Sequence, residues 1–218
     1  MDSVIPVTAL RHSRYSSGMM IPATQPEAAS GRCAWTKLDP PAKRERLLAA
    51  ATEVFARDGL DAPMSVVADA AGAGVASVYR LFESKRELLA ALVVRRMDTL
   101  AVAADEAYRQ PGGRWEALTG MLTNLVNAQR ADYLIGDARA AVADHPDVIA
   151  AVTRTGVAQE RLLAAARAEG RLRADATTLD LRLLFAATRA ARRLEPDRWQ
   201  RVFELMIDAL DAHRDAAH

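Results

Sequence analysis

The sequence has one cysteine and no long apolar run, and each scarcity excludes a class of protein. A single cysteine, Cys33, cannot form an internal disulfide, which favours a reducing compartment. No apolar run reaches the roughly 18 residues that a membrane span needs. The first residues include the acidic Asp2 and no apolar segment before a small-residue cleavage site, so we expect no secretory signal. These features predict a cytoplasmic protein without a membrane partner.

Signatures of catalysis and metal binding are also scarce. No two of the four histidines stand at a zinc-ligand spacing such as i, i+4: His12, His145, His213 and His218. Cys33 has no positioned base beside it, and no glycine-rich phosphate loop joins a strand pattern to a helix pattern. We therefore expect no enzyme activity, no metal and no cofactor.

The residues that are abundant favour helices. The chain has 218 residues, a formal net charge of +1 and 50% hydrophobic residues, enough for one large or two small globular domains. Alanine makes up about a fifth of it, and only four of the nine prolines fall after residue 41. Residues 1–41 hold the other five prolines without a sustained apolar period, which predicts a flexible N-terminal arm. The remainder predicts an all-α fold of about nine helices.

Proline and glycine predict where these helices begin and end. Pro63, Pro111, Pro146 and Pro196 precede apolar-periodic stretches, and Gly59, Gly72, Gly112 and Gly170 follow such stretches. Ser84 and Glu87 have the spacing of a capping box, in which each side chain binds the other residue's amide. The helices predicted at the N-terminal end are Lys43–Asp58, Pro63–Ala71, a short helix ending near Arg80, and a long helix from Lys85 to about Tyr108.

The two short helices and their glycine turn have the arrangement of a helix-turn-helix, in which the second helix enters a DNA major groove. Small or polar residues, Ala76, Ser77 and Arg80, are the candidates to face the groove, whereas Val75, Val78 and Phe82 are spaced to face the protein. Residues 32–96 carry a net charge of +3 and residues 97–218 a net charge of −2, as expected if the first part faces phosphates. A plain corner of a helical bundle would show the same spacing.

The stretch 68–82, ADAAGAGVASVYRLF, followed by SKRELL at 84–89, resembles the N-terminal domain of TetR-family transcriptional regulators. The resemblance implies a helix-turn-helix DNA-binding domain at 42–88 and a larger helical domain for ligand binding and dimerisation at 89–218. It implies a homodimer that binds double-stranded operator DNA, usually as a repressor, and responds to a small-molecule effector of unknown identity. By this resemblance Tyr79 and Lys85 contact DNA phosphates, and Ala76, Ser77 and Arg80 face the groove.

Local chemistry supports a phosphate contact for Lys85, because the free amides and the dipole at the start of a helix attract an anion. A solvated surface lysine is the alternative, and the Tyr79 ring can also pack while its hydroxyl reaches DNA. Ala76 has little hydrogen-bonding capacity, so base readout depends on Ser77, on Arg80 or on Ser65 of the preceding helix. The chain departs from the family pattern at Ala73, where valine is commoner, and at Leu81, where a polar residue is frequent.

The C-terminal part offers a dimer surface and a ligand cavity. Thr177 and Asp180 make a capping-box start for one helix, and the last helix carries an apolar stripe. That stripe can pack within the chain, but the resemblance places the last two helices at a two-fold interface. The candidate interface residues are Trp199, Val202, Phe203, Met206, Ile207 and Leu210.

A ligand cavity is implied by the resemblance alone. The candidates to line it are bulky or flexible side chains, for each of which core packing is the alternative: Met97, Tyr108, Trp115, Met121, Leu125, Tyr133 and Phe185. No charged constellation is evident among them, which favours a largely apolar effector. A helical ligand carrier or protein-interaction module that has lost DNA binding is the competing function.

Overall fold

The structure, a computed structural model, describes residues 35–128 and 135–213. This part of the chain forms nine α-helices, which confirms the predicted all-α fold, and its one bridge pairs Leu172 with Asp211. The helices are α2 (Pro40–Asp58), α3 (Met64–Ala71), α4 (Val75–Leu81), α5 (Lys85–Arg109), α6 (Arg114–Ala128), α7 (Ile135–Ala141), α8 (Pro146–Ala168), α9 (Thr178–Leu194) and α10 (Trp199–Leu210). None of the helices in these residues is long and apolar enough to cross a membrane.

The first described helix begins three residues before its predicted start at Lys43. Asp39 is its N-cap and accepts a hydrogen bond of 2.8 Å from the Ala42 amide, while two prolines occupy the first turn. Trp35, only 5% exposed, packs into the core nearby. Residues 35–41, predicted as part of a flexible arm, are therefore folded, because a buried tryptophan and a capped helix hold them. The rest of the predicted arm, residues 1–34, lies outside the described residues.

The predicted helix ends are largely confirmed. Gly59, Gly72 and Gly170 follow α2, α3 and α8 with positive φ angles of 83°, 68° and 75°, a conformation that costs glycine little. The capping box at the start of α9 is present, with Asp180 Oδ2 accepting from the Thr177 amide at 2.7 Å. At the start of α5, Ser84 accepts from the Glu87 amide at 3.2 Å, but the Glu87 carboxylate turns to His145 and completes no capping box.

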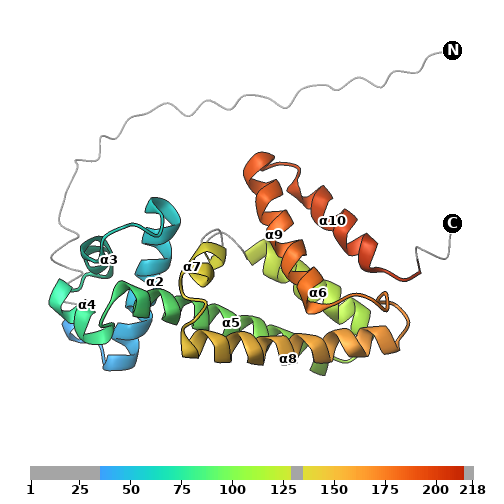
Figure 1. The fold of residues 1–218 in the computed structure, drawn as a ribbon, viewed down its shortest axis with the longest axis horizontal. Coiled ribbons are helices and arrows are strands. Elements are labelled where there is room, and N and C mark those ends of the chain that lie inside the picture. The colour runs from blue at the N-terminus through green and yellow to red at the C-terminus, as the bar shows by residue number, and fades with distance from the viewer. Residues whose placement is uncertain (1–34, 129–134, 214–218) are drawn as a thin grey trace, which may run out of the picture.

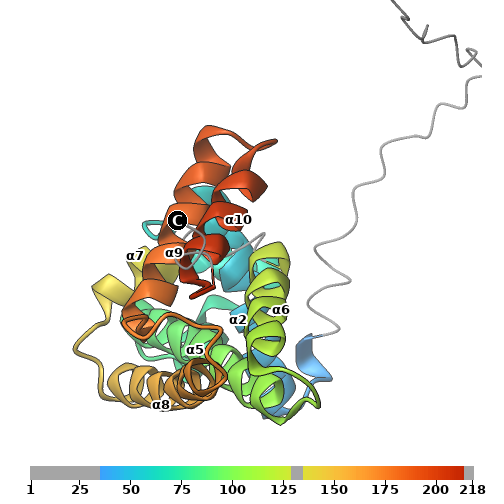
Figure 2. The ribbon, with the colours of Figure 1, turned by 90° about the vertical axis from the view of Figure 1, so that its right-hand side faces the viewer.

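Helix α5 is the element that joins the two ends of the molecule. It lies beside α8 along the molecule, with α2, α3 and α4 at one end, while α9 and α10 stand together on one side of the pair (Figures 1 and 2). A hydrogen bond of 2.8 Å from the buried Thr155 Oγ1 of α8 to the Met97 carbonyl pins the two long helices together. A shift of α8 is thus transmitted directly to α5.

Two hydrophobic cores are built on opposite halves of α5. The first packs α2, α3 and α4 against α5 as far as Met97 and includes Ala138, Val142, Val148 and Ala151 of α7 and α8. The second begins with Ala104 of α5 and joins it to α6, α8, α9 and α10. The division between the cores falls inside α5, well after the predicted domain boundary at 88/89, because one uninterrupted helix contributes to both.

Candidate nucleic-acid interface

A three-residue turn joins α3 to α4. Gly72 ends α3 in the left-handed conformation, and the Ala73 amide donates to the Ala68 carbonyl at 2.8 Å. Gly74 is the N-cap of α4 and its carbonyl accepts from the Ser77 amide at 2.8 Å. The small Ala73 is buried at 5% exposure, so the turn packs closely under α4 despite the missing valine. This is the tight connection that a helix-turn-helix requires.

The faces of α4 separate packing from solvent. Val78 is fully buried and Phe82, its C-cap, is 3% exposed, as predicted. Val75, predicted to face the protein, is 40% exposed, because it stands in the first turn, where no neighbouring helix covers it. No sequence signal indicates this exposure, since valine suits a buried position equally well. A methyl-bearing side chain on the groove side can contact a thymine methyl group.

The residues predicted to contact DNA lie on accessible surface. Ala76, Tyr79 and Arg80 are exposed, with Tyr79 at 48%, and Ser77 is half-buried between them. The Arg80 Nη2 donates to Ser77 Oγ at 2.9 Å, which holds the guanidinium along the helix. Ser65 is exposed in the first turn of α3. The structure thus offers Ser77 and Arg80 jointly as the hydrogen-bonding groups of α4.

Lys85 begins α5, directly after the N-cap Ser84. Its ammonium lies 5.7 Å from the centroid of the buried Phe55 ring, which supports the aliphatic stem and leaves the half-buried side chain at a helix N-terminus. The free amides and dipole of that terminus add positive potential. The Arg44 guanidinium stacks in the same way on Phe82, at 4.4 Å. Both cations are therefore held by rings of the first core.

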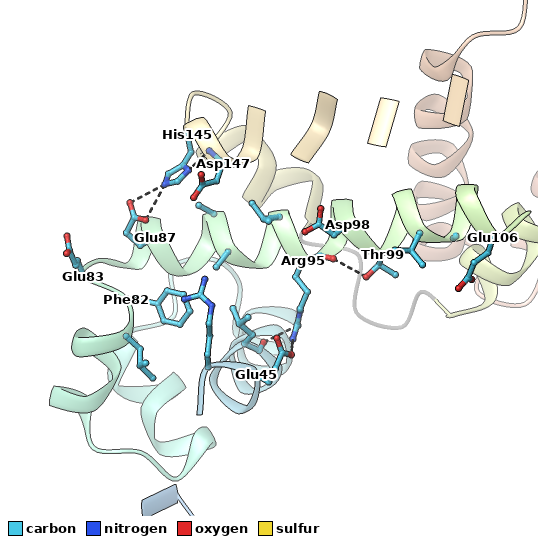
Figure 3. Close-up of a pocket in the computed structure, with 18 residues that line it drawn as sticks. Glu45, Phe82, Glu83, Glu87, Arg95, Asp98, Thr99, Glu106, His145 and Asp147 are labelled. Atoms are coloured by element: carbon cyan, nitrogen blue, oxygen red, sulfur yellow. Dashed lines mark hydrogen bonds and ion pairs between the residues drawn. The ribbon is translucent and has the colours of Figure 1, made fainter. Parts of the chain in front are cut away.

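Polar contacts tie the start of α5 to the α7–α8 junction. Arg86 bonds to Asp144 at 2.6 Å and to the Ala141 carbonyl at 3.2 Å. Figure 3 shows the neighbouring contact, in which the Glu87 carboxylate lies 3.2 Å from His145 Nε2. His145 is the N-cap of α8, and its Nδ1 accepts from the Asp147 amide at 3.3 Å. Arg86 also holds the pKa of Asp144 below its usual value by hydrogen bonding and charge. The start of α5 is thereby connected to α7 and α8.

The larger of two cavities that flank α5 is an open groove of about 1030 Å³ on its α2 side (Figure 3). Its walls carry two arginines, one histidine and six carboxylates, the last being Glu45, Glu83, Glu87, Asp98, Glu106 and Asp147. Arg95 crosses it to Glu45, at 3.3 Å, and to Thr52 of α2, at 2.8 Å. None of the described residues predicted to bind an effector lines this groove.

The predicted effector residues have different environments. Met97 and Phe185 line a second cavity, of about 260 Å³, between α5, α7 and α9. Trp115, Met121 and Leu125 are buried in the second core, which is the packing alternative left open by the sequence. The Tyr108 ring is covered by the guanidinium groups of Arg114 and Arg161, at 5.3 and 4.5 Å. Tyr133 lies outside the described residues.

The small cavity has a partly charged lining. The sequence suggested a largely apolar effector, and four arginines from three helices reach the wall of this cavity: Arg96, Arg139, Arg182 and Arg189. These residues are far apart in the sequence, so no local pattern could reveal that they meet.

The apolar stripe of α10 is mostly used inside the chain. Trp199, Phe203 and Leu210 are 8–9% exposed and belong to the second core, while Ile207 packs partly against it. Val202 and Met206 are partly exposed. The sequence could not distinguish packing within the chain from packing between chains, because both bury the same apolar stripe.

Comparison with known proteins agrees with this geometry. Residues 47–92 match the family described as bacterial regulatory proteins, tetR family. The structure is similar to a TetR transcriptional regulator, SCO0520, from Streptomyces coelicolor, with 26% identity, a TM-score of 0.58, and coverage of 77% of this chain and 98% of that one. A TetR regulatory protein from Mycobacterium vanbaalenii has 29% identity, a TM-score of 0.55, and coverages of 85% and 99%.

SmeT, the repressor of the Stenotrophomonas maltophilia multidrug efflux pump SmeDEF, shares the fold at 22% identity, with a TM-score of 0.57 and coverages of 81% and 90%. No curated protein matches the sequence. The family match covers the helix-turn-helix and the start of α5, and the structural likeness extends over most of the chain. Residues 47–92 thus match the tetR family of bacterial regulatory proteins, whose members are DNA-binding transcriptional regulators, and the chain as a whole shares the fold of TetR transcriptional regulators.

Proposed function

We propose that this protein is a homodimeric repressor that a small-molecule effector releases from its operator. The observation that carries the proposal is that one rigid helix serves both sites: α5 begins with Lys85 at the DNA-facing end and, further along, contributes Arg96, Met97 and Leu100 to the small cavity. A ligand that shifts the cavity end of α5 therefore moves the DNA-facing end. Since two recognition helices must match successive major grooves about 34 Å apart, a small change in their separation weakens binding.

A second connection between the sites runs through α7. Gly136 and Arg139 of α7 line the small cavity, and the carbonyl of Ala141, at the end of the same helix, accepts from Arg86. Arg86 adjoins Lys85, so a displacement of α7 acts on the residue next to the proposed phosphate contact. We expect this contact to strengthen the coupling between effector and operator.

The proposed dimer surface is the exposed apolar face of α9 together with the adjacent face of α10. Leu179, Leu183 and Leu194 recur on one side of α9 and are 51%, 55% and 79% exposed. On α10 the half-exposed Val202 and Met206 flank Leu205, which is 48% exposed. Leu183 and Met206 line one shallow pocket, so the two faces are continuous. An exposed apolar face of this kind is typical of a protein–protein interface.

Substitution of Leu183 tests the dimer. Leu183→Asp should leave a folded monomer, because a buried, unpaired carboxylate in an apolar interface costs several kcal/mol. Phe203→Asp should instead unfold the chain, since Phe203 belongs to the second core. The control is Val157→Asp on α8, at a side chain that is 67% exposed. Sedimentation of all three variants with circular dichroism checks this, and a folded Leu183→Asp dimer would move the interface elsewhere.

The regulatory function is tested by mobility shift with genomic DNA fragments and competitor DNA at moderate salt. We expect a specific complex that an effector dissociates. Linkage requires that an effector weakening operator affinity by some factor binds the operator-bound dimer more weakly by the same factor. Equal effector affinities for free and operator-bound protein would eliminate effector-driven release. Failure to retard any fragment would instead favour a ligand carrier.

A further inference from the structure

The small cavity between α5, α7 and α9 combines two kinds of side chain. Its apolar wall consists of Met97, Leu100, Leu179, Leu183, Phe185 and Ala186, and its polar wall consists of four arginines. The volume of about 260 Å³ is slightly below the range usual for drug-sized ligands. A cavity of this size and lining suits a small molecule with one apolar and one polar part.

No carboxylate lines this cavity among the described residues. Among these four arginines, Arg139 and Arg182 come from different helices and reach the same wall, whereas Arg154 pairs with Asp98 and Arg161 with Asp105. The like charges of Arg139 and Arg182 repel each other, which is unfavourable in one wall. The arrangement is stabilised when an anion enters.

Arg139 of α7 and Arg182 of α9 carry the argument. Arg139 is half-buried, and its pKa is lowered first by that burial and then by the charge of Arg182, with no acid opposing either effect. The two residues therefore lie close enough for their charges to repel. A guanidinium pair of this kind offers planar donors that match the two oxygens of a carboxylate.

On the opposite side of the cavity a side chain of α9 lies against the start of α7. The guanidinium of Arg189 lies on Gly136, where even a Cβ atom would come within 3.2 Å of its nitrogens. Phe185 and Met97 then supply the apolar wall from α9 and α5. A ligand with its charge at Arg139 and Arg182 would place its body against these two side chains.

We propose that the effector of this protein is a small organic carboxylate, held by Arg139 and Arg182 through its charge and by Met97, Leu100 and Phe185 through an aromatic or short aliphatic body. This inference rests on the proposed function, because it names the chemical class of the effector. Entry of the anion removes the repulsion between α7 and α9 and draws the two helices together. The end of α7 contacts Arg86, so the change reaches the DNA-facing start of α5.

Isothermal titration of the full-length protein tests the site directly. The probes are benzoate, phenylacetate and hexanoate, each paired with its neutral amide, and phenyl phosphate. We expect at least one carboxylate to bind about tenfold or more tightly than its amide, as charge-assisted hydrogen bonds require. Arg139→Gln and Arg182→Gln should each weaken that binding about tenfold. Arg161→Gln, a surface arginine paired with Asp105 outside the cavity, is the matched control and should bind as the wild type does.

Several results would overturn the inference. Equal affinity for a carboxylic acid and its amide would show that charge does not contribute to binding. Binding of phenyl phosphate alone would show that the effector is a phosphate and not a carboxylate. Since Leu179 and Leu183 belong to both the cavity and the proposed dimer surface, an acidic side chain of a second copy is another occupant of the arginines. Absence of binding by every anion, together with dissociation of the dimer by Arg139→Gln and Arg182→Gln in sedimentation, would establish that occupant.

Failure of the proposed function gives a different pattern. Suppose that a carboxylate binds through Arg139 and Arg182 but leaves the operator complex intact. The proposed anion site would then stand, and the proposal of effector-driven release would be eliminated. If a neutral amide dissociated the operator complex of the wild type as well as that of the arginine variants, effector-driven release would stand and the anion site would be eliminated.

Discussion

The DNA-facing end and the proposed effector cavity share α5 but assemble their candidate residues in opposite ways. At the DNA-facing end the candidate contacts fall between Ser65 and Lys85, on two short helices and one helix start. At the cavity, the candidate contacts come from α5, α7 and α9, from Met97 to Arg189. A site made within one short segment leaves a motif in the sequence, whereas a site made by packing distant helices does not.

Charge is also handled differently at the two ends. Lys85 and Arg44 lie over the rings of Phe55 and Phe82, which position single cations at the surface. Arg139 and Arg182 instead line one cavity, where their like charges repel each other. The first arrangement suits a regular row of phosphates, and the second suits one compact anion.

The largest expected effect tests whether the two cores are energetically one unit. Phe55→Ala should lower the free energy of unfolding by about 3–5 kcal/mol, because it empties a site that is 2% exposed in the first core. Since α5 belongs to both cores, the variant should still unfold in one transition in urea, followed by circular dichroism and tryptophan fluorescence.

The control for that prediction is Val157→Ala, which truncates a side chain that is 67% exposed and should change stability little. Two separate transitions in Phe55→Ala would show that the cores fold independently, and the comparison between the ends would become one between two domains.

A smaller effect is expected for base readout. Arg80→Ala should weaken operator binding by about 1–3 kcal/mol and relax the preference at the operator positions it contacts, because it removes the longest donor on α4. Binding to a set of single-base operator variants measures this. Ser77→Ala, which removes the partner of Arg80, should alter the same positions. A uniform loss across all variants would exclude base contact.

A weaker and sequence-independent effect is expected for Lys85. Lys85→Ala should reduce affinity about equally for all sequences and lower the slope of log affinity against log salt by about one, as loss of a phosphate contact does. Lys37→Ala is the matched control, a lysine exposed before α2. An altered sequence preference with an unchanged salt slope would contradict the phosphate contact.

The smallest expected effect concerns the start of α9 alone. The Thr177 side chain, followed by its amide, holds the pKa of Asp180 below its usual value, so the ionised carboxylate stabilises α9. That contribution is present above the unfolded pKa of about 3.9 and is lost as pH falls through the depressed folded pKa. Asp180→Asn should therefore reduce stability slightly at neutral pH and flatten its acid dependence, measured by thermal melts.

Asp61→Asn, at an exposed carboxylate of the α2–α3 turn, is the control for Asp180. An identical acid dependence in Asp180→Asn and the wild type would show that the cap contributes no pH-dependent stability.

The sequence by itself determined the features that depend on neighbours along the chain. The helix-turn-helix, the glycine helix ends and the Thr177–Asp180 capping box are local, because propensity, turn conformation and capping involve residues within a few positions. The burial of Val78 and Phe82 also followed from helical periodicity.

Only the tertiary structure decided features that depend on distant partners. Periodicity predicted the α10 stripe to be buried but could not say that Trp199 and Phe203 pack within the chain. Spacing predicted a capping box for Glu87, but His145 of another helix provides its partner. The four arginines of the cavity are separated along the sequence, and the packing of α7 and α9 on α5 brings them together. Local energies fix where helices begin and end, whereas the packing of helix faces fixes which side chains meet.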